Sequence, residues 1–174
     1  MATDTYDVAV VGGGTAGCFA AATATRAGLD VVLLERKPET EAGHIACGDA
    51  IKGTDAFPDV IDREYLRDEA FSNPNVRRAI FENPLSGTDL EVSFGDATGT
   101  VLDRRRYGEV LLEEVDRLGA EIRYDTVVRD VVQDDDGRVT GLRTVRNGDA
   151  STVEAEIVID AAGALSILQD RVDL

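Results

Sequence analysis

Residues 6–21 read YDVAVVGGGTAGCFAA, and the prediction of the fold begins from this segment. Its first part, 6–11, is a short apolar run rich in β-branched side chains, which is typical of a strand buried on both faces. Three glycines end the run, and the alanine-rich segment that closes at Gly28 predicts a helix with a glycine cap. A second buried strand is predicted over 31–34. Strand, turn, helix and strand within about thirty residues predict a βαβ unit with a parallel sheet.

The glycine turn has the G-x-G-x-x-G spacing of a dinucleotide site. Gly12 permits a tight turn, Gly14 lets the backbone approach a pyrophosphate, and Gly17 lets the helix pack closely on the strand. The phosphates would meet free N–H groups at the positive end of the helix. Glu35 ends the second strand, where a carboxylate accepts hydrogen bonds from the ribose hydroxyls of an adenosine and repels a 2′-phosphate. The site is therefore predicted to bind FAD or NAD rather than NADP.

The rest of the chain favours FAD over NAD. A compact NAD-binding domain would continue with alternating strands and helices. Here periodicity is weak between 36 and 100, which holds all four prolines and many glycines, so we expect loops and short elements there. The elements predicted after residue 36 are a short helix at 62–71, strands at 90–95 and 99–103, a helix at 107–118, and β-rich runs at 120–125, 126–133, 138–145 and 151–159. A helix followed by a β meander is closer to a flavin-binding domain.

The predicted fold class is α/β: a Rossmann-like FAD/NAD(P)-binding domain, with a central parallel sheet and an antiparallel β meander. A length of 174 residues suits one domain. Its expected parts are a βαβ nucleotide core at 5–36, an irregular excursion toward the substrate and flavin side at 37–103, a helix and β meander at 104–161, and a tail at 162–174.

The charge excludes some partners. With 34 acidic and 18 basic side chains the net charge is −16, which disfavours nucleic acid and anionic membrane surfaces. Aspartate is abundant and lysine scarce, a composition similar to that of a salt-loving microbe. The sequence shows no signal peptide and no apolar run of about 20 residues, so a soluble cytoplasmic protein with free thiols is expected. One histidine and two distant cysteines support no metal site.

Four segments resemble the geranylgeranyl reductase family, which shares the fold of p-hydroxybenzoate hydroxylase. They are YDVAVVGGGTAGCFAA with VVLLER, ACGDAI, LDRRRYGEVLLEEVDRLGAEI, and GRVTGLRTV leading to AEIVIDAAG. Members of the family reduce isoprenoid double bonds with FAD, and in archaea their substrates are the geranylgeranyl chains of membrane ether lipids.

The resemblance implies a set of cofactor-binding residues. Gly12, Gly14, Ala16 and Gly17 would lie at the pyrophosphate, and Glu35, with Arg36 beside it, at the adenosine ribose. The remaining positions are Cys47, Gly48 and Ala50 beside the flavin, Arg104 at the phosphates or ribityl chain, and Val128 touching adenine through its backbone. The resemblance supplies no catalytic residue.

The sequence departs from the family pattern at four points. Residues 47–50 read CGDA where the family usually has Cys-Gly-Glu-Gly, and Gly108 replaces the usual Asp after the aromatic residue. Ala162 stands where aromatic hydroxylases carry Asp, which favours a reductase over a hydroxylase. Relatives are about twice as long, so the chain is similar to the amino-terminal half of such an enzyme.

The resemblance implies an FAD-dependent oxidoreductase that acts on an isoprenoid lipid, with reduced ferredoxin or NAD(P)H as electron donor. The full-length protein would make peripheral membrane contact. Two alternatives remain open: a non-catalytic adenine-nucleotide-binding fragment, and a related FAD-dependent monooxygenase. Within the arginine run 104–106, the interpretation is that Arg104 contacts the cofactor, while a solvated face paired with Glu109 and Glu113 is the alternative. The single histidine, His44, is interpreted as a surface loop residue.

Overall fold

The centre of the molecule is a six-stranded sheet with the order β8-β2-β1-β11-β10-β9. The computed structural model describes residues 3–44, 50–52, 57–95, 99–164, 166 and 168–172. The parallel part consists of β1 (Thr3–Val11), β2 (Val31–Leu34), β8 (Glu121–Arg123) and β11 (Asp149–Asp160). The antiparallel part consists of β9 (Thr126–Gln133) and β10 (Val139–Arg146), which join β11. This arrangement confirms the predicted parallel sheet with a β meander.

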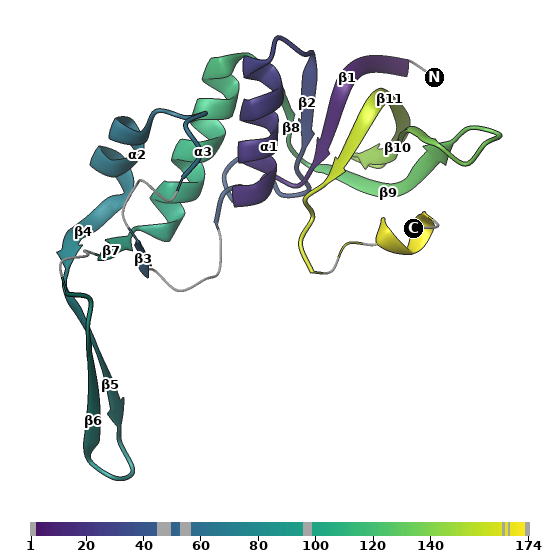
Figure 1. Cartoon of the computed structure of the whole chain (residues 1–174). Coiled ribbons are helices and arrows are strands. Elements are labelled where there is room, and N and C mark those ends of the chain that lie inside the picture. Colours follow the sequence, from purple (N-terminus) through teal and green to yellow (C-terminus); the bar gives the residue numbers. More distant parts are fainter. Residues whose placement is uncertain are drawn as a thin grey trace.

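Helices α1 (Thr15–Arg26) and α3 (Arg104–Leu118) lie side by side on one face of the sheet. Both begin at the edge where β1, β2 and β11 end (Figure 1). The four buried residues of β2 divide between the two faces: Val31 and Leu33 pack in the cluster under the helices, and Val32 and Leu34 pack on the opposite side. Residues 8–11 of β1 divide between the two faces in the same way. Burial on both faces explains why this part of β1 and the whole of β2 are continuous apolar runs.

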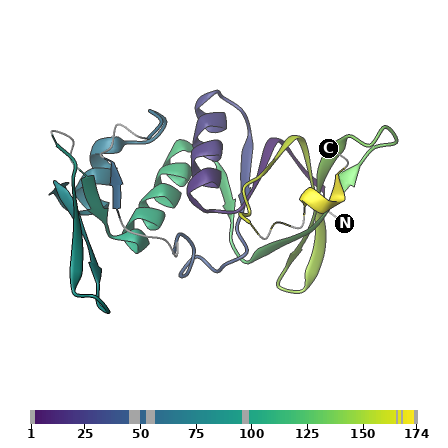
Figure 2. The ribbon, with the colours of Figure 1, turned by 60° about the horizontal axis from the view of Figure 1, so that its bottom comes forward.

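The segment between β2 and α3 forms a separate part, which we call the arm: β3 (Ala50–Lys52), α2 (Arg63–Ala70), β4 (Phe71–Val76), β5 (Arg78–Asn83), β6 (Thr88–Ser93) and β7 (Gly99–Leu102). Strands β3, β7 and β4 make one small sheet, and β5 pairs with β6 in a hairpin. The hairpin projects from the molecule (Figure 1). It lies at the opposite end from the β9–β10 hairpin, with α1 and α3 between them (Figure 2).

The structure differs from the sequence prediction mainly in the arm. Strands β4 and β5 are absent from the prediction. The segment of β4, FSNPNV, contains a proline and several polar side chains, so apolar and polar residues do not alternate along it as they do in a typical strand. Helix α3 begins three residues before the predicted 107–118, because the Asp103 carboxylate accepts the backbone N–H of Arg106 and caps the first turn. The chain ends in a short 3₁₀ helix, η2 (Gln169–Arg171).

Within the described residues, no helix is both long and apolar enough to span a membrane.

Candidate nucleotide-binding site

The turn between β1 and α1 is closed tightly on itself. Gly12 has a φ of 100°, and a Cβ added to it would lie 2.7 Å from the carbonyl oxygen of Ala161. A Cβ on Gly17 would overlap the carbonyl oxygen of Gly12. These two positions therefore require glycine for reasons internal to the fold, as the roles predicted for the turn and the helix packing imply.

Gly14 is different, because a Cβ there would meet no protein atom within 4 Å. Gly14 is also the N-cap of α1, which has no side-chain cap and no acidic residue in its first turn. Ala16, in that turn, is exposed. No side chain thus caps the first N–H groups of α1, which lie at the positive end of the helix dipole, a suitable place for an anion.

Glu35 follows β2 and is buried, with 8% of its surface exposed. Its Oε2 accepts the backbone N–H of Gly13 at 2.7 Å, and its Oε1 accepts the backbone N–H of Lys37 at 2.8 Å. Each carboxylate oxygen has a further lone pair, so Glu35 can hold the glycine turn and still accept a ribose hydroxyl. Arg36, next to it, is exposed.

Arg104 lies in the first turn of α3, with its guanidinium carbon 4.8 Å from the ring centroid of Tyr107. Its Nε is buried and has no hydrogen-bond partner among the described residues. Burial raises the pKa of Tyr107, and a side-chain hydrogen bond with Thr15, the first residue of α1, acts in the opposite direction. Tyr107 thus contacts both Arg104 and Thr15, and it brings the guanidinium of Arg104 close to the start of α1.

One participant at this edge of the sheet is missing from the sequence prediction of the site. The backbone N–H of Ala161 donates to the Val11 carbonyl at 2.9 Å, so the segment after β11 crosses the glycine turn. Asp160 fixes this segment: its Oδ1 accepts the Ala162 N–H at 3.1 Å, and its Oδ2 accepts the Ser166 hydroxyl at 2.5 Å. The signal in the sequence is an acid at a strand end six residues before a serine.

The other predicted residues within the described part of the chain lie on β9 and β3. The N–H of Thr126, at the start of β9, donates to the Glu35 carbonyl at 2.9 Å, and Val128 follows two residues later on this edge strand. Ala50 opens β3 and pairs with Val101 of β7. Cys47 and Gly48 lie outside the described residues. The structure thus gathers Gly12, Gly14, Ala16, Gly17, Glu35 and Arg104 at one edge of the sheet.

Cys18, in α1, is a buried and unreactive thiol rather than a residue of the nucleotide-binding site. The thiol is fully buried and lies 3.5 Å from the carbonyl oxygen of Gly13. Burial, with a smaller contribution from the charge of Glu35, raises its pKa to about 12. Because the thiolate is the reactive form, this cysteine is inert at neutral pH.

A protein-family model described as FAD binding domain matches residues 5–174. The chain belongs to this family. FAD is accordingly its cofactor, and the residues above fit the group. The open space beside Gly14 and the uncapped N–H groups suit the pyrophosphate of FAD, the buried Nε of Arg104 lacks an acceptor that FAD can supply, and Glu35 suits the ribose.

Several known proteins are similar to nearly the whole chain. Digeranylgeranylglycerophospholipid reductase of Methanosarcina acetivorans is 33% identical over 94% of this chain and 39% of its own length. The crystal structure of a geranylgeranyl bacteriochlorophyll reductase-like protein from Thermoplasma acidophilum is 27% identical, with a TM-score of 0.78 over 98% of this chain and 42% of its own. The myxobacterial chondrochloren halogenase CndH, 21% identical, shares the fold with a TM-score of 0.79 over 97% of this chain and 39% of its own. The chain spans about two fifths of the length of these relatives.

Proposed function

We propose that this chain is the FAD-binding part of an FAD-dependent oxidoreductase of the geranylgeranyl reductase type, which reduces isoprenoid double bonds of archaeal membrane lipids. The observation that carries the proposal is the pair formed by the uncapped start of α1 and the buried Nε of Arg104, which has no hydrogen-bond partner among the described residues. It occurs in a chain that is 33% identical to a digeranylgeranylglycerophospholipid reductase.

The bound FAD supplies the hydride chemistry, and the protein supplies binding and orientation. In this proposal, the N–H groups of Ala16 and Gly17 and the guanidinium of Arg104 bind the pyrophosphate. Glu35 accepts the ribose hydroxyls, and Arg36 lies beside them. The open backbone edge of β9 at Val128 receives the adenine. Ala50 faces the flavin side, and Cys47 and Gly48 keep the flavin contact that the resemblance implies.

The proposal includes a donor and a location. Reduced ferredoxin or NAD(P)H would deliver electrons to the flavin, and the complete enzyme would meet its lipid substrate by peripheral contact with the membrane from the cytoplasm. The excess of aspartate over lysine supports a salt-loving source.

Ala162 favours the reductase over a monooxygenase. It lies in the segment fixed by Asp160, directly beside the glycine turn, and it supplies no carboxylate there. A hydroxylase of the same fold carries Asp at this position, which serves FAD and NADPH binding. The monooxygenase is therefore the weaker of the two candidates.

Anaerobic turnover tests the proposal. The chain is loaded with FAD, reduced with dithionite, and mixed with a digeranylgeranyl ether lipid. We expect the flavin absorbance to return as the alkene is consumed, and the lipid to gain two hydrogen atoms per reduced bond by mass spectrometry. Bound flavin that stays reduced in the presence of the lipid would support the non-catalytic fragment. In a separate assay in air, without dithionite, NADPH and O2 consumption driven by an aromatic compound would support the monooxygenase.

A further inference from the structure

We infer that Arg106 is a positioning residue that holds the arm against α3 and thereby sets where the flavin ring lies relative to the phosphates of FAD. The inference rests on the proposed function, because it takes Arg104 and Ala50 as contacts to two different parts of FAD. Arg104 lies on α3, whereas Ala50 lies on the arm.

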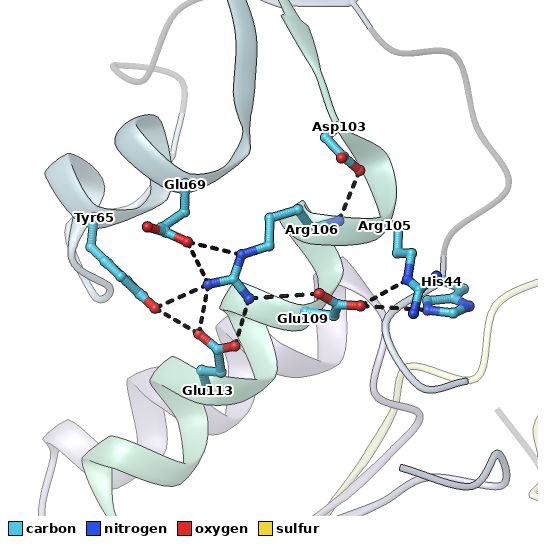
Figure 3. A network of polar contacts seen from close by, with 8 residues as sticks. All are labelled: His44, Tyr65, Glu69, Asp103, Arg105, Arg106, Glu109 and Glu113. Atoms are coloured by element: carbon cyan, nitrogen blue, oxygen red, sulfur yellow. Dashed lines mark hydrogen bonds and ion pairs between the residues drawn. The ribbon is translucent and has the colours of Figure 1, made fainter. Parts of the chain in front are cut away.

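The guanidinium of Arg106 joins carboxylates from two helices (Figure 3). Its Nε and Nη2 donate to Glu69 Oε2 of α2, at 3.0 and 2.7 Å. Its Nη1 and Nη2 donate to Glu113 Oε1 and Oε2 of α3, at 2.6 and 3.3 Å. Nη2 also donates to the Tyr65 hydroxyl of α2 at 3.2 Å. A planar guanidinium with five donors can make these contacts together, whereas a lysine ammonium cannot.

The burial and the electrostatic environment of Arg106 indicate that its guanidinium is held firmly in place. The Arg106 side chain is 26% exposed, whereas that of Arg105 is 68% exposed. Hydrogen bonds from Arg106 hold the pKa of Glu113 below its usual range. In turn, the carboxylates of Glu113 and Glu69 hold the pKa of Arg106 above its usual value. Glu109 extends the network: its Oε2 lies 3.6 Å from Arg106 Nη1, and its Oε1 lies 3.7 Å from His44 Nε2.

Arg106 lies between two backbone attachments of α2. The N–H of Asp62, before α2, donates to the Glu114 carboxylate at 2.8 Å, and the N–H of Asp103 donates to the Ala70 carbonyl at the end of α2, also at 2.8 Å. The arm returns to α3 through β7, whose partner β3 carries Ala50. Strand β4 follows α2 directly and pairs with the other edge of β7. The seating of α2 on α3 therefore sets the tilt of the β3–β7–β4 sheet, and with it the orientation of Ala50 relative to Arg104.

The three arginines 104–106 differ in their partners. Arg105 pairs with Glu109 at 2.9 Å, and Arg106 pairs with Glu69 and Glu113. Arg104 has no carboxylate partner among the described residues. The alternative of a paired, solvated face thus applies to two of the three, and Arg104 is the one available to an anion.

The experiment compares FAD with ADP, because ADP occupies only the pyrophosphate and adenosine part of the site. Binding of each ligand to the wild-type chain, Arg106→Gln and Arg106→Lys is measured by calorimetry, and flavin absorbance and fluorescence are recorded for the FAD complexes. Arg78→Gln is the matched control, since it removes an arginine that pairs with Glu91 at 3.3 Å within the hairpin of the arm.

We expect Arg106→Gln to weaken FAD about tenfold, within the usual range of coupling energies, and to alter the flavin spectrum while ADP affinity stays unchanged. Arg106→Lys should restore little of the loss, and Arg78→Gln should match the wild type. Retained ADP affinity shows that the variants are folded. Equal losses for FAD and ADP, or no loss for either, would overturn the positioning role alone. A wild-type chain that binds ADP and not FAD would overturn the proposed function, and this inference with it.

Discussion

In the proposed site, Glu35 connects the glycine turn to the ligand, because one carboxylate would serve both. It accepts the Gly13 N–H at 2.7 Å in a buried position, so its negative charge is already held where the ribose is proposed to bind. The same residue thus contributes to the shape of the turn and, in the proposal, to recognition of the sugar. A change at Glu35 is expected to affect the stability of the fold and the affinity for the ligand together.

Glu35→Gln should lower the affinity for FAD and for ADP about tenfold and destabilise the fold by about 1–2 kcal/mol, because hydrogen bonds to a charged acceptor are the stronger ones. Calorimetry and urea unfolding measure the two effects. The control is Glu39→Gln, since Glu39 is exposed. Unchanged affinity for both nucleotides in Glu35→Gln would contradict the role at the ribose.

Gly108 illustrates how a departure from the family pattern has a local physical cause. A Cβ on Gly108 would overlap the carbonyl group of Gly43, so the backbone of α3 and the segment 36–44 are in direct contact. The Asp usual at this position in the family could not be accommodated here without moving that segment.

Gly108→Ala should therefore destabilise the chain by about 1–3 kcal/mol, as overpacking against rigid backbone does. Gly148→Ala is the control: Gly148 has a φ of 89° and open space around it, so only backbone strain of about 1 kcal/mol is expected. Urea unfolding compares the two. A smaller effect at Gly108 than at Gly148 would show that the contact with Gly43 is not tight in solution.

At the scale of elements, the β5–β6 hairpin has one apolar face and one mainly polar face, which also carries Ile80. Its pairing places Ala79 and Phe81 opposite Val92 and Leu90 on one face. Phe81 and Leu90 are 60% and 62% exposed. The other face carries acidic side chains and the ion pair of Arg78 with Glu91. A two-stranded hairpin with its apolar face in water is marginally stable by itself and promotes association.

Replacing both Phe81 and Leu90 with threonine should lower the fluorescence of a hydrophobic dye and reduce self-association seen by light scattering. Global unfolding should change by less than about 0.5 kcal/mol, since the side chains are at the surface. Glu82→Gln, on the opposite face, is the control. Equal dye binding by the double variant and the wild type would contradict the exposure of this face.

Helices α2 and α3 are joined by a buried carboxylate, Glu114, which is 1% exposed. Arg117 donates to it twice at 2.7 Å, and the Asp62 N–H donates at 2.8 Å. The hydrogen bonds from Arg117, followed by that from Asp62, hold the pKa of Glu114 below its usual range. A lowered folded-state pKa means that the carboxylate stabilises the fold above its unfolded pKa of about 4.3, and that this contribution disappears as pH falls through the folded-state value.

Glu114→Gln should cost about 1–3 kcal/mol at neutral pH, because charged hydrogen bonds are replaced by neutral ones. The difference between variant and wild type should shrink as the pH falls below about 4.3. Urea unfolding at a series of pH values measures it. A difference that stays constant down to the acid limit would mean that Glu114 does not titrate as this structure implies.

For the whole molecule, local pattern and long-range pairing explain which features the sequence can predict. The βαβ unit can be predicted because burial of β2 and of residues 8–11 of β1 on both faces demands continuous apolar runs. It can also be predicted because backbone atoms leave no room for a side chain at Gly12 and Gly17. Strands β4 and β5 escape prediction because their partners, rather than their own side chains, define them. The same reason hides Asp160 at the glycine turn and Arg106 between α2 and α3, since both act through contacts far apart in the sequence.

The central claim is that this chain binds FAD at the edge of the sheet between the start of α1, Glu35 and Arg104. Backbone amide chemical shifts recorded by NMR during an FAD titration test it most directly. We predict that the largest shifts fall on residues 12–17, 35 and 104, and that the solvated turn 134–137 does not move. Saturating FAD that leaves residues 12–17 unshifted, or that shifts only residues away from this edge, would contradict the account.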